Sequence, residues 1–247
     1  MPGSLLTPSA LAYRLKILTG VYLDHQFERK SPLSAMPPEL LNAVYSPEIV
    51  LPPRRHLEKP GGQTLEGLVF LAGLVRALDV QSAFEIGTFD GVTTWTLARN
   101  MDSGVVDTLD LPADERPRLP IEHTDEEVRG LISDHVYDVL PHPAAIEQHW
   151  GDSAIFDFSE WRGKCDLVYI DGAHSELYVA SDTRNAFAML SEHGAIVWDD
   201  YWRQVTGVPK VLHELAAPRP SRVPGTRLAV HLTPGAEARL KSPSRDC

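Results

Sequence analysis

The chain has 247 residues, of which 43% are hydrophobic and 23% are charged, a composition that is ordinary for a globular protein. Its 23 basic and 34 acidic side chains give a formal net charge of −11 without a local basic patch. Such a surface repels phosphate groups, so we expect neither nucleic acid nor a membrane as a partner. The two cysteines, Cys165 and Cys247, form no disulfide framework, which favours a cytoplasmic location.

The hydropathy pattern predicts no membrane span and no signal peptide. The longest apolar run, Leu65–Leu78, is interrupted by Glu66 and Arg76. Arg14 and Lys16 interrupt the apolar stretch near the N-terminus, where a signal peptide requires an uncharged core.

Residues 1–62 form a proline-punctuated segment that we interpret as a helical N-terminal extension. Helical spacing predicts one helix over 9–21 and a short helix over 37–45. Two interpretations stay open for this extension, an edge cap without function and a cover over a substrate pocket. The main domain is expected over 63–240, and residues 241–247 are expected to be a loose tail.

Strands and helices alternate through the main domain. Thr64 is the predicted N-cap of a helix over 65–78, and Thr124 begins a capping box for a helix that extends to Val139. Further helices are predicted over 91–100, 176–190 and 208–215, and strands over 81–85, 105–110, 144–150, 166–171, 195–198, 221–223 and 226–232. The alternation predicts an α/β fold with a mostly parallel sheet and helices on both faces.

Acidic residues stand at or just after the ends of these strands. They are Glu85, Asp110, Asp152, Asp171, Asp199 and Asp200. Open α/β sheets bind their ligands beyond the carboxyl ends of the strands, so we expect these side chains at one site.

A glycine-spaced turn follows the first of these strands. Gly87 and Gly91 allow a ligand to approach the backbone, and the amides from Gly91 to Thr93 can hold an anionic group. Asp110 is placed to accept hydrogen bonds from a ribose. The turn lacks the three glycines of dinucleotide-binding proteins and the lysine of a phosphate-binding loop, which favours a nucleoside-type cofactor.

The ordered motifs carry a resemblance to a known family. They are Phe84–Gly91, Thr108–Leu111, Gly151–Ser153, Asp166–His174 and Val197–Tyr201. Together they resemble the motifs of class I S-adenosylmethionine-dependent methyltransferases, and more narrowly those of small-molecule O-methyltransferases that act on sugars, natural products and, more distantly, catechols. The resemblance covers about Thr64 to Leu232. It implies a Rossmann-like seven-stranded sheet with an antiparallel last strand, S-adenosylmethionine as cofactor and a small-molecule acceptor.

The resemblance also implies a cofactor site. Glu85 and Gly87 would line the methionine part, Asp110 would hold the ribose, and Asp171 would lie near the sulfonium. The wall of the site and the contacts near the adenine would come from Thr88, Phe89, Gly91, Thr93, Leu111, Asp152 and Ser153. Helix capping or a surface pair is the alternative for Glu85 and Asp110, and a role in forming the turn is the alternative for Asp152.

Three carboxylates of two strand ends, Asp171, Asp199 and Asp200, would repel one another if they met without a partner. A divalent cation such as Mg²⁺ would relieve this repulsion and could bind two oxygens of a substrate. Acids at the matching positions of metal-dependent relatives do so. The alternative is that Asp199 and Asp200 cap or hydrogen-bond a loop, without a metal.

His174 matches the position of the lysine general base in the catechol enzymes, and histidine can also perform this role near neutral pH. The alternative is a helix cap or a cofactor contact. Tyr201 and Trp202 are candidates for stacking on a substrate or for packing. The acidic run from Asp125 to Glu127 is interpreted as a solvated helix start.

The sequence therefore predicts an O-methyltransferase assisted by Mg²⁺, with His174 and Asp171 as catalytic residues. The alternatives are a metal-independent methyltransferase, a nicotinamide-dependent oxidoreductase and a binding protein without catalysis. The sequence leaves the acceptor open, and it leaves open whether the chain forms a homodimer.

Overall fold

The structure is a computed structural model that describes residues 24, 26–57, 61–129 and 134–242. The predicted helix over 9–21, most of the predicted tail and Cys247 lie outside these residues. Cys165 is buried in the core. Among the helices that are described, none has the length and apolar character needed to cross a bilayer.

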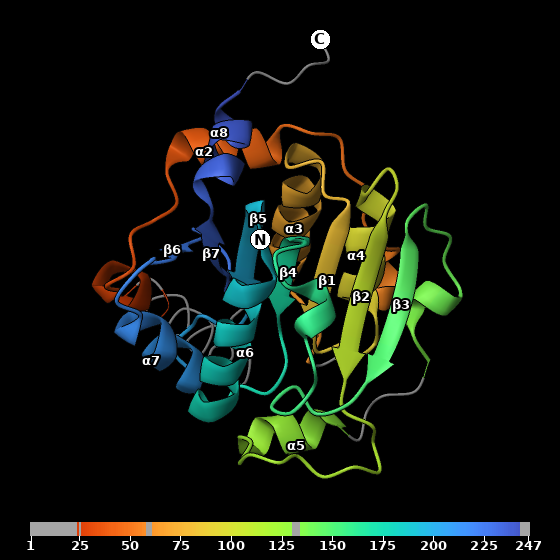
Figure 1. Ribbon diagram of the computed structural model, residues 1–247. Coiled ribbons are helices and arrows are strands. Elements are labelled where there is room, and N and C mark those ends of the chain that lie inside the picture. The colour runs from red at the N-terminus through yellow and green to blue at the C-terminus, as the bar shows by residue number, and fades with distance from the viewer. Residues whose placement is uncertain (1–23, 25, 58–60, 130–133, 243–247) are drawn as a thin grey trace, which may run out of the picture.

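A seven-stranded sheet with the order β3-β2-β1-β4-β5-β7-β6 forms the centre of the fold (Figure 1). β1 to β5 are parallel, and β7 runs antiparallel to both β5 and β6, so the predicted topology is confirmed. The strands are β1 Ser82–Ile86, β2 Val105–Asp110, β3 Ala145–Trp150, β4 Cys165–Ile170, β5 Leu190–Trp198, β6 Ser221–Arg222 and β7 Ala229–Leu232.

Helices cover both faces of the sheet, as predicted. One face packs against α2 (Pro38–Tyr45), α3 (Leu65–Ala77), α4 (Val92–Asn100) and α8 (Pro234–Lys241), and the other packs against α6 (Glu176–Met189) and α7 (Gly207–Glu214). β4 illustrates why the central strands of the sheet carry apolar side chains on both faces. Its side chains alternate, so that Leu167 and Tyr169 enter the first core while Val168 and Ile170 enter the second.

The N-terminus of α3 has the predicted cap. The Thr64 hydroxyl accepts a hydrogen bond from the Gly67 amide at 3.1 Å, and Glu66 lies in the first turn, where the helix dipole favours an acid. The three short 3-10 helices are η1 Arg54–His56, η2 Val136–Asp138 and η3 Ser159–Trp161.

The helix predicted from Thr124 to Val139 is wrong in its extent and in its cap. α5 spans His123–Arg129, so Thr124 lies inside the helix, and the Glu122 amide donates to Asp125 Oδ2 at 3.1 Å. Residues 134 and 135 are not helical, η2 begins at Val136, and the Val139 side chain is 68% exposed. The predicted helix therefore does not extend to Val139.

Candidate active site

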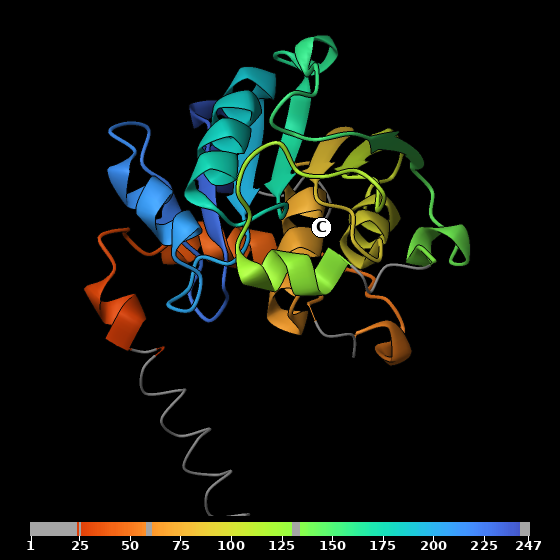
Figure 2. The same ribbon diagram turned by 90° about the horizontal axis from the view of Figure 1, so that it is seen from below.

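A cavity of about 450 Å³ lies beyond the carboxyl ends of β1, β2 and β4. α5 lies across this end of the sheet, which Figure 2 shows from below. The predicted site residues that line the cavity are Gly87, Phe89, Asp110, Leu111, Asp152, Ser153, Asp171, His174 and Asp200. The others, which are Glu85, Thr88, Gly91, Thr93 and Asp199, are buried behind the cavity wall.

The turn after β1 needs glycine at Gly87. This residue has a φ of 99°, and a Cβ atom placed on it would lie 2.1 Å from the carbonyl oxygen of Asp171. The β1 turn and the end of β4 thus touch through backbone atoms, which leaves the Gly87 side of the cavity open to a ligand. Phe89 also adopts a positive φ, of 48°, and lines the same wall.

Glu85 is completely buried beneath this turn. Its Oε2 accepts hydrogen bonds from the hydroxyls of Thr94 and Thr108, the latter at 2.7 Å, while Oε1 has no partner in the described part of the chain. Burial raises the pKa of Glu85 to about 8 against the effect of these two hydroxyls. Glu85 therefore supports the turn from behind.

Asp110 ends β2 and faces the cavity. It accepts from the Phe89 amide at 3.0 Å through Oδ2 and from the Leu111 amide at 2.8 Å through Oδ1. These bonds hold the carboxylate between the glycine turn and the next loop.

Asp152 anchors a loop. Its carboxylate accepts from the Arg118 amide at 2.6 Å, from the Tyr178 hydroxyl at 2.7 Å and from the Ala154 amide at 2.8 Å. The bond to Ala154 is the turn-forming role that was the alternative for Asp152. Ser153 beside it lines the cavity and stays a candidate for contact with the adenine.

The three carboxylates of the predicted metal site are close enough to affect one another. Burial and the charges of Asp171 and Asp200 raise the pKa of Asp199 well above its ordinary value. Asp199 is 6% exposed, and its Oδ1 finds no hydrogen-bond partner among the described residues.

Asp200 is already paired with two cationic side chains. Its Oδ1 lies 3.1 Å from Nη1 of Arg227, and its Oδ2 lies 3.2 Å from Nε2 of His174. Within the ranges that the structure describes, no group of His, Cys, Asp or Glu side chains converges as a site for a metal ion.

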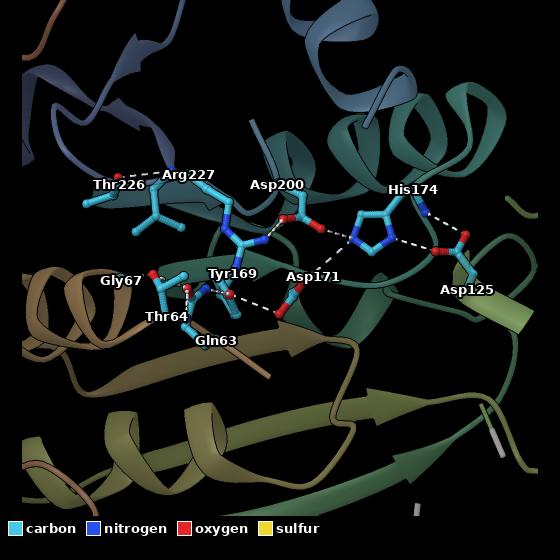
Figure 3. A network of polar contacts seen from close by, with 11 residues as sticks. Gln63, Thr64, Gly67, Asp125, Tyr169, Asp171, His174, Asp200, Thr226 and Arg227 are labelled. Atoms are coloured by element: carbon cyan, nitrogen blue, oxygen red, sulfur yellow. Dashed lines mark hydrogen bonds and ion pairs between the residues drawn. The ribbon is translucent and has the colours of Figure 1, made fainter. Parts of the chain in front are cut away.

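His174 is the centre of a polar network that Figure 3 shows from Asp125 to Arg227. Its Nδ1 lies 2.6 Å from Asp125 Oδ1, and its Nε2 lies 3.8 Å from Asp171 Oδ1. Burial lowers the pKa of His174, but the hydrogen bond to Asp125 and the nearby carboxylates of Asp171 and Asp200 outweigh burial and raise it well above the ordinary value.

A second arm of the network reaches the start of α3. Gln63 donates to the Tyr169 hydroxyl at 2.6 Å, and that hydroxyl donates to Asp171 Oδ2 at 3.0 Å. Tyr169 is buried, so this chain of bonds orients Asp171 from the interior.

Four residues of the site were missed by sequence reasoning, namely Gln63, Asp125, Tyr178 and Arg227. Asp125 belongs to an acidic run that is typical of an exposed helix start, and Arg227 lies in the hairpin before β7.

Tyr201 and Trp202, which follow the Asp199-Asp200 pair, differ in role. Tyr201 packs inside, with its hydroxyl 2.7 Å from Nε2 of His213, whereas Trp202 lines the cavity beneath the Arg227 guanidinium, which lies 4.9 Å from its ring centroid.

Comparison with known proteins gives a family match. Residues 84–201 match the family model described as a methyltransferase domain. This segment contains the glycine turn, the ends of β2, β3 and β4, and the Asp199-Asp200 pair. No curated protein matches the chain.

Solved structures with similar folds include three methyltransferases. The chain is 14% identical to the S-adenosylhomocysteine-bound methyltransferase PaMTH1 of Podospora anserina, with a TM-score of 0.49 and coverage of 93% of this chain and 98% of that one. The O-methyltransferase TomG of Streptomyces achromogenes, in complex with S-adenosylmethionine, is 17% identical, with a TM-score of 0.47 and coverage of 86% and 96%.

An O-methyltransferase from Bacillus cereus with S-adenosylhomocysteine is also 17% identical, with a TM-score of 0.48 and coverage of 86% and 97%. The family match covers residues 84–201 of the fold described above, the segment that carries most of the cavity, and it indicates a methyltransferase domain in this part of the chain.

Proposed function

We propose that this protein is an S-adenosylmethionine-dependent methyltransferase that transfers the methyl group to a hydroxyl oxygen of a small molecule such as a sugar or a natural product. The observation that carries this proposal is His174, which lines the cavity next to Asp171, where the resemblance places the sulfonium. A hydroxyl group must lose its proton as its oxygen attacks the methyl carbon. An imidazole beside the reacting atoms is suited to accept that proton.

The cofactor would lie along the glycine turn. Asp110 would accept hydrogen bonds from the ribose hydroxyls, and the open backbone at Gly87 would receive the methionine part. Ser153 would lie near the adenine. Catalysis would come mainly from holding the acceptor oxygen, the methyl carbon and the sulfur in line.

His174 needs a change in its surroundings before it can act as a base. The carboxylates of Asp125, Asp171 and Asp200 raise the pKa of His174 and so favour the protonated ring. Positive charge brought by the sulfonium would offset part of their effect and lower the pKa of the imidazole towards neutrality. We therefore expect His174 to become a proton acceptor only when the cofactor is bound.

We further propose that Asp171, Asp199 and Asp200 hold Mg²⁺. Carboxylate oxygens are the ligands that this cation prefers, and the unpartnered Oδ1 of buried Asp199 supports a role for a further ligand. When bound, the cation would make the acceptor hydroxyl more acidic.

Metal-independent transfer by the same residues is the second candidate. The ion pairs of Asp200 with Arg227 and His174 favour it, because they already balance one of the three charges. A chelator separates the two candidates. Loss of turnover in EDTA that Mg²⁺ restores supports the metal, and full turnover in EDTA refutes it.

Formation of S-adenosylhomocysteine from S-adenosylmethionine across a panel of sugars and phenols tests the proposed reaction. We expect turnover with at least one hydroxylated acceptor and a large loss of turnover in His174→Ala with unchanged cofactor affinity. Tight cofactor binding without turnover on the whole panel would instead indicate a binding protein, and tight binding of NADH would indicate an oxidoreductase.

A further inference from the structure

Asp125 differs from the acids beside it on α5. Glu126 and Glu127 are exposed, whereas the Asp125 side chain is 9% exposed and lines the cavity. Burying a carboxylate is costly unless its oxygens are hydrogen-bonded. Both oxygens of Asp125 have partners, and most of these bonds come from a single residue.

That residue is His174, which lies 49 positions away in the sequence. Asp125 Oδ1 is 2.6 Å from the ring nitrogen Nδ1, and Asp125 Oδ2 accepts from the His174 backbone amide at 3.1 Å. The hydrogen bond from the backbone amide fixes the main chain after β4, and the hydrogen bond to Nδ1 fixes the rotation of the imidazole. Figure 3 shows the carboxylate facing the ring on the side opposite Asp200.

The pairing also determines which nitrogen is left without a proton when the ring is neutral. A carboxylate only accepts hydrogen bonds, so Nδ1 must carry a proton. Nε2 is left facing Asp171 and Asp200, at distances of 3.8 and 3.2 Å. An acidic residue that holds a catalytic imidazole in one tautomer is a recurring arrangement in general-base catalysis.

We propose that Asp125 is a positioning residue that holds His174 with Nε2 towards the reacting atoms. This inference rests on the proposed function of His174 as the base. Because Asp125 belongs to α5, the base is oriented only when α5 lies over the cavity. The segment before α5 is fixed by two further hydrogen bonds. The Arg118 amide donates to Asp152, and the Thr206 hydroxyl donates to Glu122 Oε1 at 3.2 Å.

Steady-state kinetics of Asp125→Asn tests the proposal, with Glu126→Gln as the matched control on the same helix. Asparagine keeps the size of the side chain but can place an amide donor against Nδ1, which disfavours the required tautomer. We expect kcat to fall by roughly 100-fold, the order of a general-base contribution. KM for S-adenosylmethionine should change less than twofold, and Glu126→Gln should behave like the wild type.

A double variant separates positioning from general damage to the fold. If Asp125 acts through His174, adding Asp125→Asn to His174→Gln lowers kcat no further than His174→Gln alone. If the double variant instead loses kcat by the product of the two single losses, the proposal is overturned. A kcat of Asp125→Asn within twofold of the wild type would overturn it as well.

Proton NMR provides a readout that does not depend on turnover. The hydrogen-bonded Nδ1 proton of His174 should give a resonance downfield of the amide region that is lost in both His174→Gln and Asp125→Asn and kept in Glu126→Gln. Its persistence in Asp125→Asn would overturn the pairing. If His174→Gln keeps full turnover while the resonance follows Asp125, the proposed base is wrong but the pairing is real.

Discussion

Replacing Glu85 with glutamine should make the protein more stable at pH 7.5 and leave its stability at pH 4.5 little changed. The carboxyl group is completely buried, and its pKa rises from the ordinary 4.5 to about 8. Between these values the unfolded chain releases the proton while the folded chain keeps it. Folding stability is therefore present below pH 4.5 and is lost as the pH rises towards 8.

The size of the effect follows from the width of this window. One pH unit corresponds to about 1.4 kcal/mol, so the wild type should lose about 3 to 4 kcal/mol between pH 4.5 and 7.5 through this group. Glutamine does not titrate, and its carbonyl oxygen can still accept from Thr94 and Thr108. The variant should escape this loss.

Urea denaturation of both proteins without cofactor, at pH 4.5, 6 and 7.5, measures the difference. The gain in unfolding free energy of Glu85→Gln should grow steadily with pH. Thr108→Val is a useful companion, because it removes one hydroxyl that stabilises the ionised form of Glu85 and should extend the loss of stability to higher pH. A difference between Glu85→Gln and wild type that is the same at all three pH values would refute the reasoning.

Other predictions concern the cofactor wall and the C-terminal helix. Asp110→Ala should weaken binding of S-adenosylhomocysteine more than tenfold in calorimetry, because a hydrogen bond to a charged group contributes about 1.5–3 kcal/mol, and unchanged affinity would remove the ribose assignment. Gly87→Ala should lower the melting temperature and abolish cofactor binding, because its Cβ would lie 2.1 Å from the Asp171 carbonyl oxygen; wild-type values of both would contradict this placement. Thr233→Ala should cost about 1 kcal/mol in urea denaturation by removing the cap of α8, and no loss would show that the cap is dispensable.

The central sheet could be predicted because its signals are local. β4 and the second half of β5 are apolar on both faces, and each parallel strand is followed by a turn or an acid that marks its end. α8 was missed because its eight residues begin with Pro234-Gly235 and bury only Ala236 and Leu240, which gives little helical period. The predicted extent of α5 was wrong because spaced valines and a capping-box pattern do not show where a chain leaves the helical conformation.

The candidate site could be predicted where it is built from strand ends and not where it depends on contacts between distant segments. The ends of β1, β2, β4 and β5 bring Gly87, Asp110, Asp171 and Asp200 to one cavity, as expected for a parallel sheet. The pairing of Asp125 with His174 depends on the path of the loop before α5. That path is fixed in part by Asp152, for which the sequence suggested only an adenine contact or a turn.

The position of α8 has a practical consequence for protein engineering. This helix packs on β5 and α2, and Arg239 donates a hydrogen bond to the Leu78 carbonyl at the end of α3. A chain cut after Leu232 would therefore uncover apolar surface on the face of the sheet opposite α6. A fusion partner or affinity tag joined after Ser242 leaves that surface covered, and it also lies far from the cavity that α5 covers.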